Sequence, residues 1–277
     1  MKTQVSLVIF TTEGREYLLE KTYHSFLNSC DFKFNQVIMA IDGIVDQKII
    51  KIVNPTKLVQ NYKRTGYISS IVNALKMIDN QFFLWLEDDW LFSSKIDIHT
   101  LVNLLKNNSE WLQIRLSKTA PLMEQEKKLE LCKGIFESID GFSANPCICR
   151  TEYIEKGFKA LQNSQLDERI SFENFFSQWC NAQSIVCTVL DPGEAPMVIH
   201  SGYLESTPRQ WHMTASLDGK VETYLSGMGN TDSPPPFWRK CLMLFKLILV
   251  SIKIAILQFW NLSFYDLAFR IVNIKQY

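Results

Sequence analysis

Short apolar runs alternate with segments of helical period along the chain as far as about residue 200, and this alternation constrains the fold most strongly. Each run spans roughly four to six residues and is closed by turn residues, which is typical of strands buried on both faces. Alternating strands and helices favour a parallel sheet with helices on both sides over a sandwich or a helix bundle. We therefore predict an α/β fold with a mostly parallel sheet flanked by helices.

The apolar and helical patterns also locate the individual elements. The expected strands are 5–10, 36–41, 57–62, 82–86, 111–116, 185–189 and 197–200, with a further apolar stretch at 142–150. The expected helices are 14–29, 67–78, 98–106, 151–161 and 168–179. The stretch 118–133 is rich in Glu, Lys and Gln, so we expect an exposed excursion or flexible loop over one end of the sheet, with a plain solvated helix as the alternative.

Three consecutive prolines, Pro234 to Pro236, mark the clearest break in the chain. Proline has no backbone N–H, so such a run continues neither a helix nor a sheet ladder. We accordingly expect one α/β domain over residues 1–232 and a separate segment over residues 233–277.

The strand expected at 82–86 leads directly into three acids, Glu87, Asp88 and Asp89, followed by Trp90. The carboxyl ends of parallel strands face the crevice in which α/β proteins bind ligands. Neighbouring carboxylates repel one another unless a cation or hydrogen-bond donors compensate them. Mg²⁺ or Mn²⁺ holding a diphosphate would do so, because these ions combine one or two carboxylates with phosphate oxygens. The alternative is an acidic turn that caps the next helix.

Charge and missing motifs exclude several classes of function. The 29 Lys and Arg balance the 29 Asp and Glu, which argues against nucleic acid as the main partner. No phosphate-binding loop, dinucleotide fingerprint, nucleophile elbow or zinc-protease motif is present in the sequence. The seven cysteines are scattered without a C-x-x-C pair, which indicates free thiols in a reducing compartment.

The order of these motifs resembles that of a GT-A fold, family-2-like glycosyltransferase. A polar turn follows the first strand, Asp42 closes the second, and the acidic triplet stands where such enzymes carry their D-x-D motif. Residues 86–90 resemble an L-E-D-D-W signature, and residues 142–146 are similar to the F-x-x-N-P stretch that follows it. The resemblance covers about residues 3–203 and rests on motif order.

The resemblance implies a role for residues at several strand ends. Thr11 and Glu13 would lie at the nucleotide edge, and Asp42 would contact the base. Asp88 would face the ribose or the metal shell, and Asp89 would be the main metal ligand.

Three further residues complete the expected site. Arg64 would approach the diphosphate, and His200, which follows a strand, fits the late His that completes the metal shell in several GT-A enzymes. An inverting transfer also needs a carboxylate that takes a proton from the acceptor hydroxyl. Glu173 occupies the place of the family's base motif, with Asp167 and Glu168 as alternatives that also suit simple helix capping.

The segment 237–260 is strongly apolar but carries a narrow basic stripe. From Cys241 to Trp260 only Lys246, Ser251, Lys253 and Gln258 are polar. Basic residues on one side and aromatic residues at both ends suit an amphipathic helix lying in the interface of an anionic membrane. Packing in a dimer or against the domain, and a true membrane span, are the alternatives.

Together these features predict an enzyme that moves a sugar from a nucleotide diphosphate to a glycan or lipid-linked glycan. A UDP-sugar donor, Mn²⁺ or Mg²⁺ as the cofactor, and inversion at the transferred carbon are expected. The enzyme would be cytoplasmic and peripheral on the inner face of a membrane, in cell-surface polysaccharide or glycolipid synthesis. A second copy of the chain, in a homo-oligomer, is a further expected partner. The alternatives are a sugar-phosphate nucleotidyltransferase and a non-catalytic module that binds a nucleotide sugar or a membrane.

Overall fold

A computed structural model describes residues 4–116, 122–164, 172–191, 193 and 196–201 of the chain. The domain boundary expected at residue 232 and the amphipathic segment 237–260 lie outside these residues. Within the described part, no helix combines the length and apolar character that crossing a bilayer requires.

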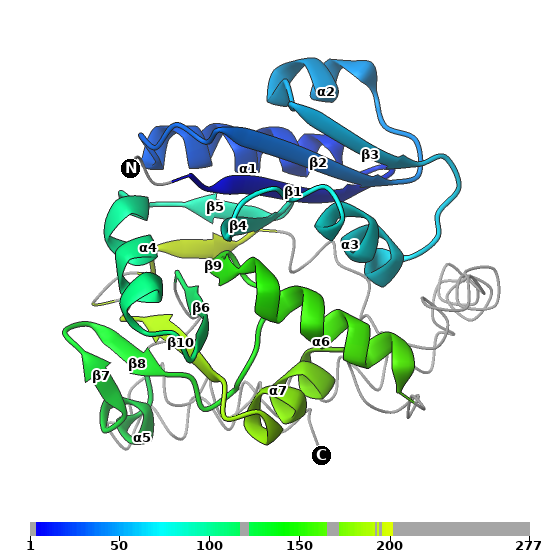
Figure 1. The fold of residues 1–277 in the computed structure, drawn as a ribbon. Helices are drawn as coiled ribbons and strands as arrows, with labels where there is room; N and C mark the ends of the chain where they lie inside the picture. Colours follow the sequence, from blue (N-terminus) through cyan, green and yellow to red (C-terminus); the bar gives the residue numbers. More distant parts are fainter. Residues whose placement is uncertain (1–3, 117–121, 165–171, 192, 194–195, 202–277) are drawn as a thin grey trace, which may run out of the picture. The chain divides into compact units, whose positions relative to one another are not determined.

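The described chain forms an α/β domain built on a nine-stranded sheet (Figure 1). In chain order the strands are β1 (Ser6–Thr12), β2 (Gln36–Asp42), β3 (Lys57–Asn61), β4 (Phe82–Glu87), β5 (Trp90–Phe92), β6 (Trp111–Arg115), β7 (Glu130–Cys132), β8 (Ile135–Glu137), β9 (Cys147–Arg150), β10 (Val186–Leu190) and β11 (Val198–His200). The helices are α1 (Glu16–Ser29), α2 (Gln47–Val53), α3 (Tyr67–Leu75), α4 (Ile98–Asn107), α5 (Glu124–Lys127), α6 (Thr151–Asn163) and α7 (Phe172–Ala182).

The strand order is β3-β2-β1-β4-β9-β6-β10-β8-β7. Strands β3, β2, β1 and β4 run parallel to one another, and β6 runs parallel to β10. Strand β9 lies between β4 and β6 and is antiparallel to both. Strands β4 and β6 therefore point the same way, and the mostly parallel sheet predicted from the sequence is confirmed.

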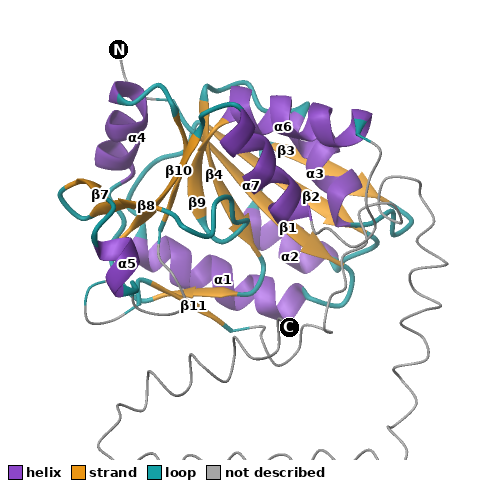
Figure 2. Cartoon of the chain, turned by 90° about the horizontal axis from the view of Figure 1, so that it is seen from below, coloured by secondary structure: helices purple, strands orange, loops and turns teal. Residues whose placement is uncertain are grey.

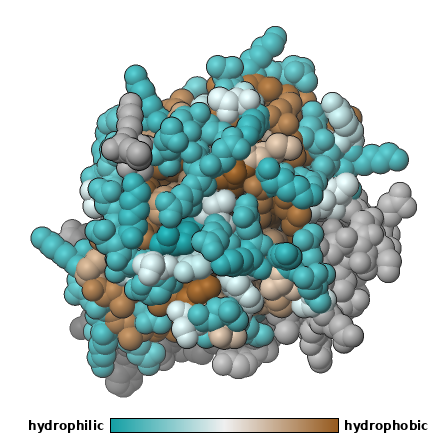
Figure 3. Space-filling model, viewed as in Figure 1, coloured by the Kyte–Doolittle hydropathy of each residue, from teal (hydrophilic) through white to brown (hydrophobic). Residues whose placement is uncertain are grey.

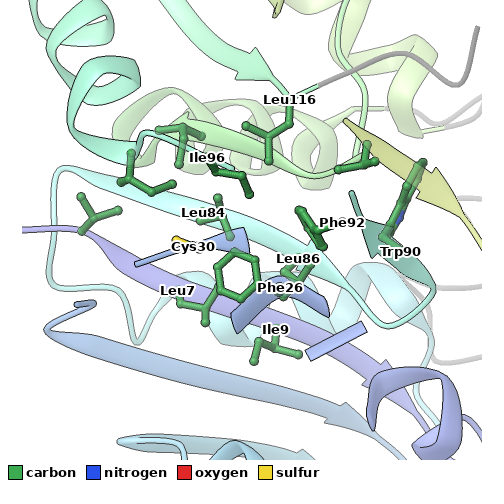
Figure 4. Close-up of a cluster of buried hydrophobic side chains, with 14 of the residues drawn as sticks. Leu7, Ile9, Phe26, Cys30, Leu84, Leu86, Trp90, Phe92, Ile96 and Leu116 are labelled. Atoms are coloured by element: carbon green, nitrogen blue, oxygen red, sulfur yellow. The ribbon is translucent and has the colours of Figure 1, made fainter. Parts of the chain in front are cut away.

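Helices cover both faces of this sheet (Figure 2). One core cluster joins side chains of α1, α2 and α4 to alternate residues of β1 and β4 such as Leu7 and Leu84. The other joins α3, α6 and α7 to the intervening residues, including Val8 and Trp85. This alternation follows from the two-residue period of a strand, which turns successive side chains to opposite faces. Figure 4 shows part of the first cluster, where Phe26 of α1 packs among Leu7, Ile9 and Leu86.

Hydrophilic side chains cover most of the surface seen in Figure 3, with apolar side chains exposed between them. Residues 117–121 lie outside the described part, and most of residues 122–133 are exposed, as the predicted exposed excursion requires. This part contains α5 and β7, and the β7–β8 pair extends the sheet at one edge. Strand β7 is largely exposed, and a small cluster of Leu122, Phe136 and Val189 packs beside it.

Helices α6 and α7 approach so closely that one position tolerates only glycine. A Cβ atom on Gly157 would lie 2.3 Å from Cε1 of Phe176, which is fully buried. Because α7 carries Glu173 and starts near the carboxyl edge of the sheet, this contact also fixes the place of a candidate site residue.

We expect Gly157→Ala to lower the free energy of unfolding. Overpacking of a core costs about 1–3 kcal/mol, which outweighs the gain of about 1 kcal/mol from replacing glycine inside a helix. Urea unfolding measures the change, and Glu155→Ala on the exposed face of α6 is the control. Adding Phe176→Leu to Gly157→Ala should restore part of the loss. A more stable Gly157→Ala single variant would contradict the packing described.

Candidate functional site

The candidate site lies where β4 ends. All but the last residue of β4 are buried, and the strand leads into Asp88 and Asp89, which are only 5% and 4% exposed. Phe10 of β1 is paired with Glu87, so the end of β4 lies beside the end of β1 and the turn that follows it. Two adjacent buried carboxylates demand compensation within reach.

Side chains from β1 and the following turn supply this compensation. The hydroxyl of Thr11 donates to Oδ2 of Asp88 at 2.7 Å. The guanidinium of Arg15 donates from Nε to Oδ1 of Asp88 at 2.9 Å, and its Nη2 contacts both that oxygen, at 2.8 Å, and Oδ2 of Asp89. Arg15 therefore bridges the two carboxylates. The side chain of Arg15 is only 13% exposed, so water screens these charges weakly.

The two carboxyl groups respond differently to this environment. Burial raises the pKa of Asp88 to about 6, although Arg15 and the Thr11 hydroxyl act in the opposite direction. Burial also acts to raise the pKa of Asp89, but the hydrogen bond from His200 and the charge of Arg15 outweigh it, so the pKa of Asp89 is lowered. Burial disfavours the charge of Arg15, yet the two carboxylates raise the pKa of Arg15. Asp89 is thus the more firmly ionised of the two acids.

The backbone of this acidic turn is held by α1 and by the end of β11. The hydroxyl of Thr22 donates to the carbonyl of Asp88 at 2.8 Å and accepts from the N–H of Trp90 at 3.0 Å. The N–H of Ser201 donates to the carbonyl of Asp89 at 2.8 Å. These bonds fix the direction in which both carboxylates point.

His200 is brought to the same place by a two-stranded pairing outside the main sheet. Strand β11 pairs antiparallel with β5, and His200 lies opposite Trp90. Nε2 of His200 is 3.1 Å from Oδ2 of Asp89, and its ring packs on Trp90 with centroids 4.6 Å apart. The structure thus brings together Asp89 and His200, the two residues predicted as metal ligands.

Glu87, the first acid of the triplet, points to a different set of partners. The Tyr67 hydroxyl donates to Oε1 of Glu87, and Nε1 of Trp90 donates to Oε2 at 3.3 Å. Glu87 therefore ties the start of α3 to the Trp90 ring that supports His200.

The residues predicted for the nucleotide edge lie at the ends of β1 and β2. The carboxylate of Asp42 accepts from the N–H groups of Thr65, at 2.6 Å, and Gly66, at 3.0 Å. Both carboxylate oxygens of Asp42 therefore accept hydrogen bonds from the loop that leads into α3. Oε2 of Glu13 accepts from the N–H of Ile44 at 3.1 Å.

Close packing around Gly43 brings Glu13 and Arg64 together at the ends of β1 and β2. Gly43 has a φ of +108°, and a Cβ atom there would lie 2.7 Å from Oε2 of Glu13 and 3.2 Å from Cγ of Arg64. Glu13, Arg64 and the loop after β2 are therefore neighbours. A glycine at this point is needed both for its backbone conformation and for space.

Glu173 is placed by two bonds between α7 and the segment before β9. Oε1 of Glu173 accepts from the N–H of Ala144 at 2.7 Å, and one turn later the hydroxyl of Ser177 accepts from the N–H of Phe142 at 3.0 Å. Burial raises the pKa of Glu173, and the Ala144 N–H and nearby Arg115 offset part of this rise.

The antiparallel course of β9 brings Glu173 to the acidic edge. Cys147, the first residue of β9, is paired with Trp85 near the end of β4, so the segment before β9 lies at the same edge as the acidic turn. Ring contacts join the two regions, because Tyr67, bonded to Glu87, meets the ring of Phe172 at 5.9 Å. The alternative bases Asp167 and Glu168 lie outside the described residues.

The candidate metal ligands are of a type that divalent metals accept, but they are few. Oδ1 of Asp89 is buried and has no hydrogen-bond partner among the described residues, and His200 adds an imidazole nitrogen beside the same carboxylate. No group of three or more His, Cys, Asp or Glu side chains in the described part is arranged to hold a metal ion. Asp89 and His200 fit a metal that takes its remaining ligands from phosphate oxygens and water, as Mg²⁺ commonly does.

Sequence reasoning missed Arg15 and Thr22. Arg15 stands in the polar turn after the first strand, and the need to compensate two carboxylates was a signal for such a cation. Thr22 lies in the middle of a regular helix, and nothing in the neighbouring sequence indicates that its hydroxyl bonds to the backbone of the acidic turn after β4.

No family model and no curated protein matches the sequence. Among solved structures, the chain is similar to GalNAc-T7 with UDP, GalNAc and Mn²⁺, with a TM-score of 0.53 and 15% identity over 78% of this chain and 48% of that one. It is also similar to TarS from S. aureus, with a TM-score of 0.49 and 18% identity over 70% of this chain and 36% of that one. The chain thus spans less than half the length of either protein. The first likeness confirms the predicted GT-A fold.

We expect Thr22→Val to lower the free energy of unfolding by about 1–3 kcal/mol, because it removes the acceptor of the buried Trp90 N–H. Thr22→Ser, which keeps the hydroxyl, is the matched control and should lie close to the wild type. Thermal or urea unfolding of the three proteins gives the comparison. Equal losses in both variants would mean that packing of the threonine methyl group, and not its hydroxyl, supports the acidic turn.

Proposed function

We propose that the chain is a glycosyltransferase that moves a sugar from a nucleoside diphosphate donor to a hydroxyl group of a glycan or lipid-linked glycan. The observation that carries this proposal is the buried pair Asp88 and Asp89 at the carboxyl end of β4, with Arg15 and His200 around it. Such a site suits a diphosphate, whose negative charge needs cations, next to a sugar whose hydroxyls need carboxylate acceptors.

Donor binding would use two neighbouring regions of the sheet edge. The nucleoside would lie along Thr11, Glu13 and Asp42, and Arg64 would approach the diphosphate. Asp88 would face the ribose. A UDP-sugar is the favoured donor, and the similarity of the fold to GalNAc-T7, whose structure contains UDP and Mn²⁺, supports this choice.

Asp89 and His200 would hold Mn²⁺ or Mg²⁺. When bound, the ion supplies positive charge to the diphosphate as it leaves. The chain's own residues orient this arrangement: Trp90 supports the His200 ring, and Ser201 fixes the backbone of Asp89.

Glu173 is the proposed base. Its carboxylate would take the proton of the acceptor hydroxyl as the oxygen of that hydroxyl forms a bond to the anomeric carbon. The bond from that carbon to the diphosphate breaks, and the nucleoside diphosphate leaves with the electron pair. One direct displacement inverts the configuration of the carbon. Glu173 lies in the first turn of α7 and is bonded to the segment before β9, and this position near the acidic edge supports its proposed role.

The proposal extends to location and partners. Residues 237–260 would place the enzyme on the inner face of a membrane as a peripheral cytoplasmic protein, where a lipid-linked acceptor for surface polysaccharide or glycolipid synthesis is confined. Formation of a homo-oligomer through the same segment is the competing use of its apolar face.

Calorimetric titration tests the donor site directly. UDP, GDP and CMP are each titrated with and without Mn²⁺ into the wild type and into Asp89→Asn. We expect one nucleotide to bind, and to need both the metal and Asp89. Absence of binding by all three, together with turnover of a nucleoside triphosphate and a sugar phosphate to pyrophosphate, would overturn the proposal in favour of a nucleotidyltransferase.

Glu173→Gln is expected to lower kcat by about 10²–10⁴-fold, because a general base of this kind contributes that much. Donor affinity should stay within about twofold, since glutamine keeps an oxygen that accepts from Ala144. Transfer from the donor that binds in calorimetry is measured for the variant and for Glu155→Gln, an exposed control on α6. Full activity in Glu173→Gln would remove Glu173 as the base.

The pH dependence of kcat/KM gives a separate test. The base must be ionised, so activity falls as pH drops through the pKa of Glu173. Since burial raises this pKa above the ordinary value of 4.5, we expect the acid limb above pH 4.5 and its disappearance in the residual activity of Glu173→Gln. An acid limb unchanged by the substitution would assign it to another group.

A further inference from the structure

Arg15 is bound to the same carboxylate that a metal ion would use. Its Nη2 contacts Oδ2 of Asp89, and Nε2 of His200 is 3.1 Å from the same oxygen. The other oxygen, Oδ1, has no hydrogen-bond partner among the described residues. A metal ion held by His200 and Asp89 would therefore share this carboxylate with the guanidinium of Arg15. Like charges repel strongly in a poorly hydrated site, so a guanidinium and a divalent ion cannot share the carboxylate at low cost.

The metal-free site is already compensated by the protein itself. Arg15 makes three contacts with Asp88 and Asp89, and Thr11 donates to the remaining oxygen of Asp88. Removing Arg15 without replacement would leave two neighbouring carboxylates buried, which is strongly unfavourable. Arg15 therefore has a structural task that a bound dication would take over.

We propose that Arg15 is an internal counter-ion that competes with the divalent metal for Asp89. Metal binding requires Arg15 to withdraw from Asp89, and the diphosphate of the donor provides the anion to which the freed guanidinium turns. This rests on the proposed function, because it assigns the order of ligand binding at the donor site. The metal and the nucleoside diphosphate then bind cooperatively, and each raises the affinity for the other by the same factor.

The small donor set supports this coupling independently. Asp89 and His200 converge, and the described residues contain no group of three or more His, Cys, Asp or Glu side chains that could hold a metal ion, so a metal ion alone gains few protein ligands. A metal that arrives with a diphosphate gains further oxygen ligands at the moment when Arg15 gains a new anionic partner. The wild-type site should accordingly bind the metal weakly by itself.

The test is titration of the full chain with Mn²⁺ alone, with free Mn²⁺ measured by electron paramagnetic resonance. We expect weak binding by the wild type and at least tenfold tighter binding by Arg15→Met, which keeps an unbranched stem like that of arginine and removes the charge. Lys48→Met is the matched control, since it removes one positive charge that pairs with Glu20 on the surface, and it should bind Mn²⁺ like the wild type. The double variant Arg15→Met with Asp89→Asn should lose the tight site.

Thermal unfolding provides a second readout. Arg15→Met should unfold at a lower temperature than the wild type, and Mn²⁺ should raise its midpoint by more than it raises that of the wild type. If Arg15→Met does not fold without metal, Arg15→Lys is used. It keeps one cation but loses the fork that spans both acids, so its affinity for Mn²⁺ should exceed that of the wild type.

Two results would overturn the proposal: tight Mn²⁺ binding by the wild type, or no gain in affinity in the folded Arg15 variants. Neither the Mn²⁺ affinity nor the unfolding temperature depends on sugar transfer. A chain that shows the Arg15 effect but binds no nucleotide and transfers no sugar would therefore refute the proposed function and leave the competition for Asp89 established.

Discussion

The arrangement of the candidate site depends on the contact of one guanidinium with two adjacent buried carboxylates. Asp88 and Asp89 follow a strand that is buried up to its last residue, and both side chains are almost entirely shielded from water. The surrounding elements each contribute a donor: β1 supplies Thr11, the following turn supplies Arg15, and β11 supplies His200. Losing one partner of a buried charge pair typically costs about 3–5 kcal/mol, so these contacts restrict which loops can change without loss of the fold.

The topology explains how a helix that starts about eighty residues later reaches the same edge. In an all-parallel sheet the segments that precede strands lie at the opposite edge from those that follow them. Strand β9 is antiparallel, so the segment before it, which bonds to Glu173, lies beside the ends of β4 and β6. One reversed strand thus places a carboxylate from α7 across from the acidic turn. The contact of Gly157 with Phe176 then sets how closely α7 packs against α6.

The sequence predicted the position of a site residue best where that position depends on the residues next to it in the chain. Strand ends are of this kind, so the positions of Asp88, Asp89 and Asp42 at one edge followed from apolar runs and turn residues. Pairings between distant segments were harder. The β5–β11 pair that carries His200 to Asp89 was not predicted, and His200 itself was proposed only from motif order. The residues around Asp42 also gave no sign that its two oxygens would accept from Thr65 and Gly66. The role of Arg15 was not predicted, because the sequence alone does not distinguish a single arginine in a turn from an ordinary solvated side chain. Only the fold shows that Asp88 and Asp89 lie beside it.

The three acids of the triplet divide into separate tasks because their side chains meet different elements. Glu87 is the last residue of β4 and turns toward Tyr67 and Trp90, so it links α3 to the ring on which His200 packs. Asp88 turns toward β1, where Thr11 and Arg15 meet it, and burial holds its pKa near 6. Asp89 alone is shared between Arg15 and His200 and keeps a buried oxygen without a partner among the described residues. The guanidinium of Arg15 can therefore be exchanged for a divalent metal ion at Asp89, while the bonds of Glu87 and Asp88 keep the neighbouring elements in position.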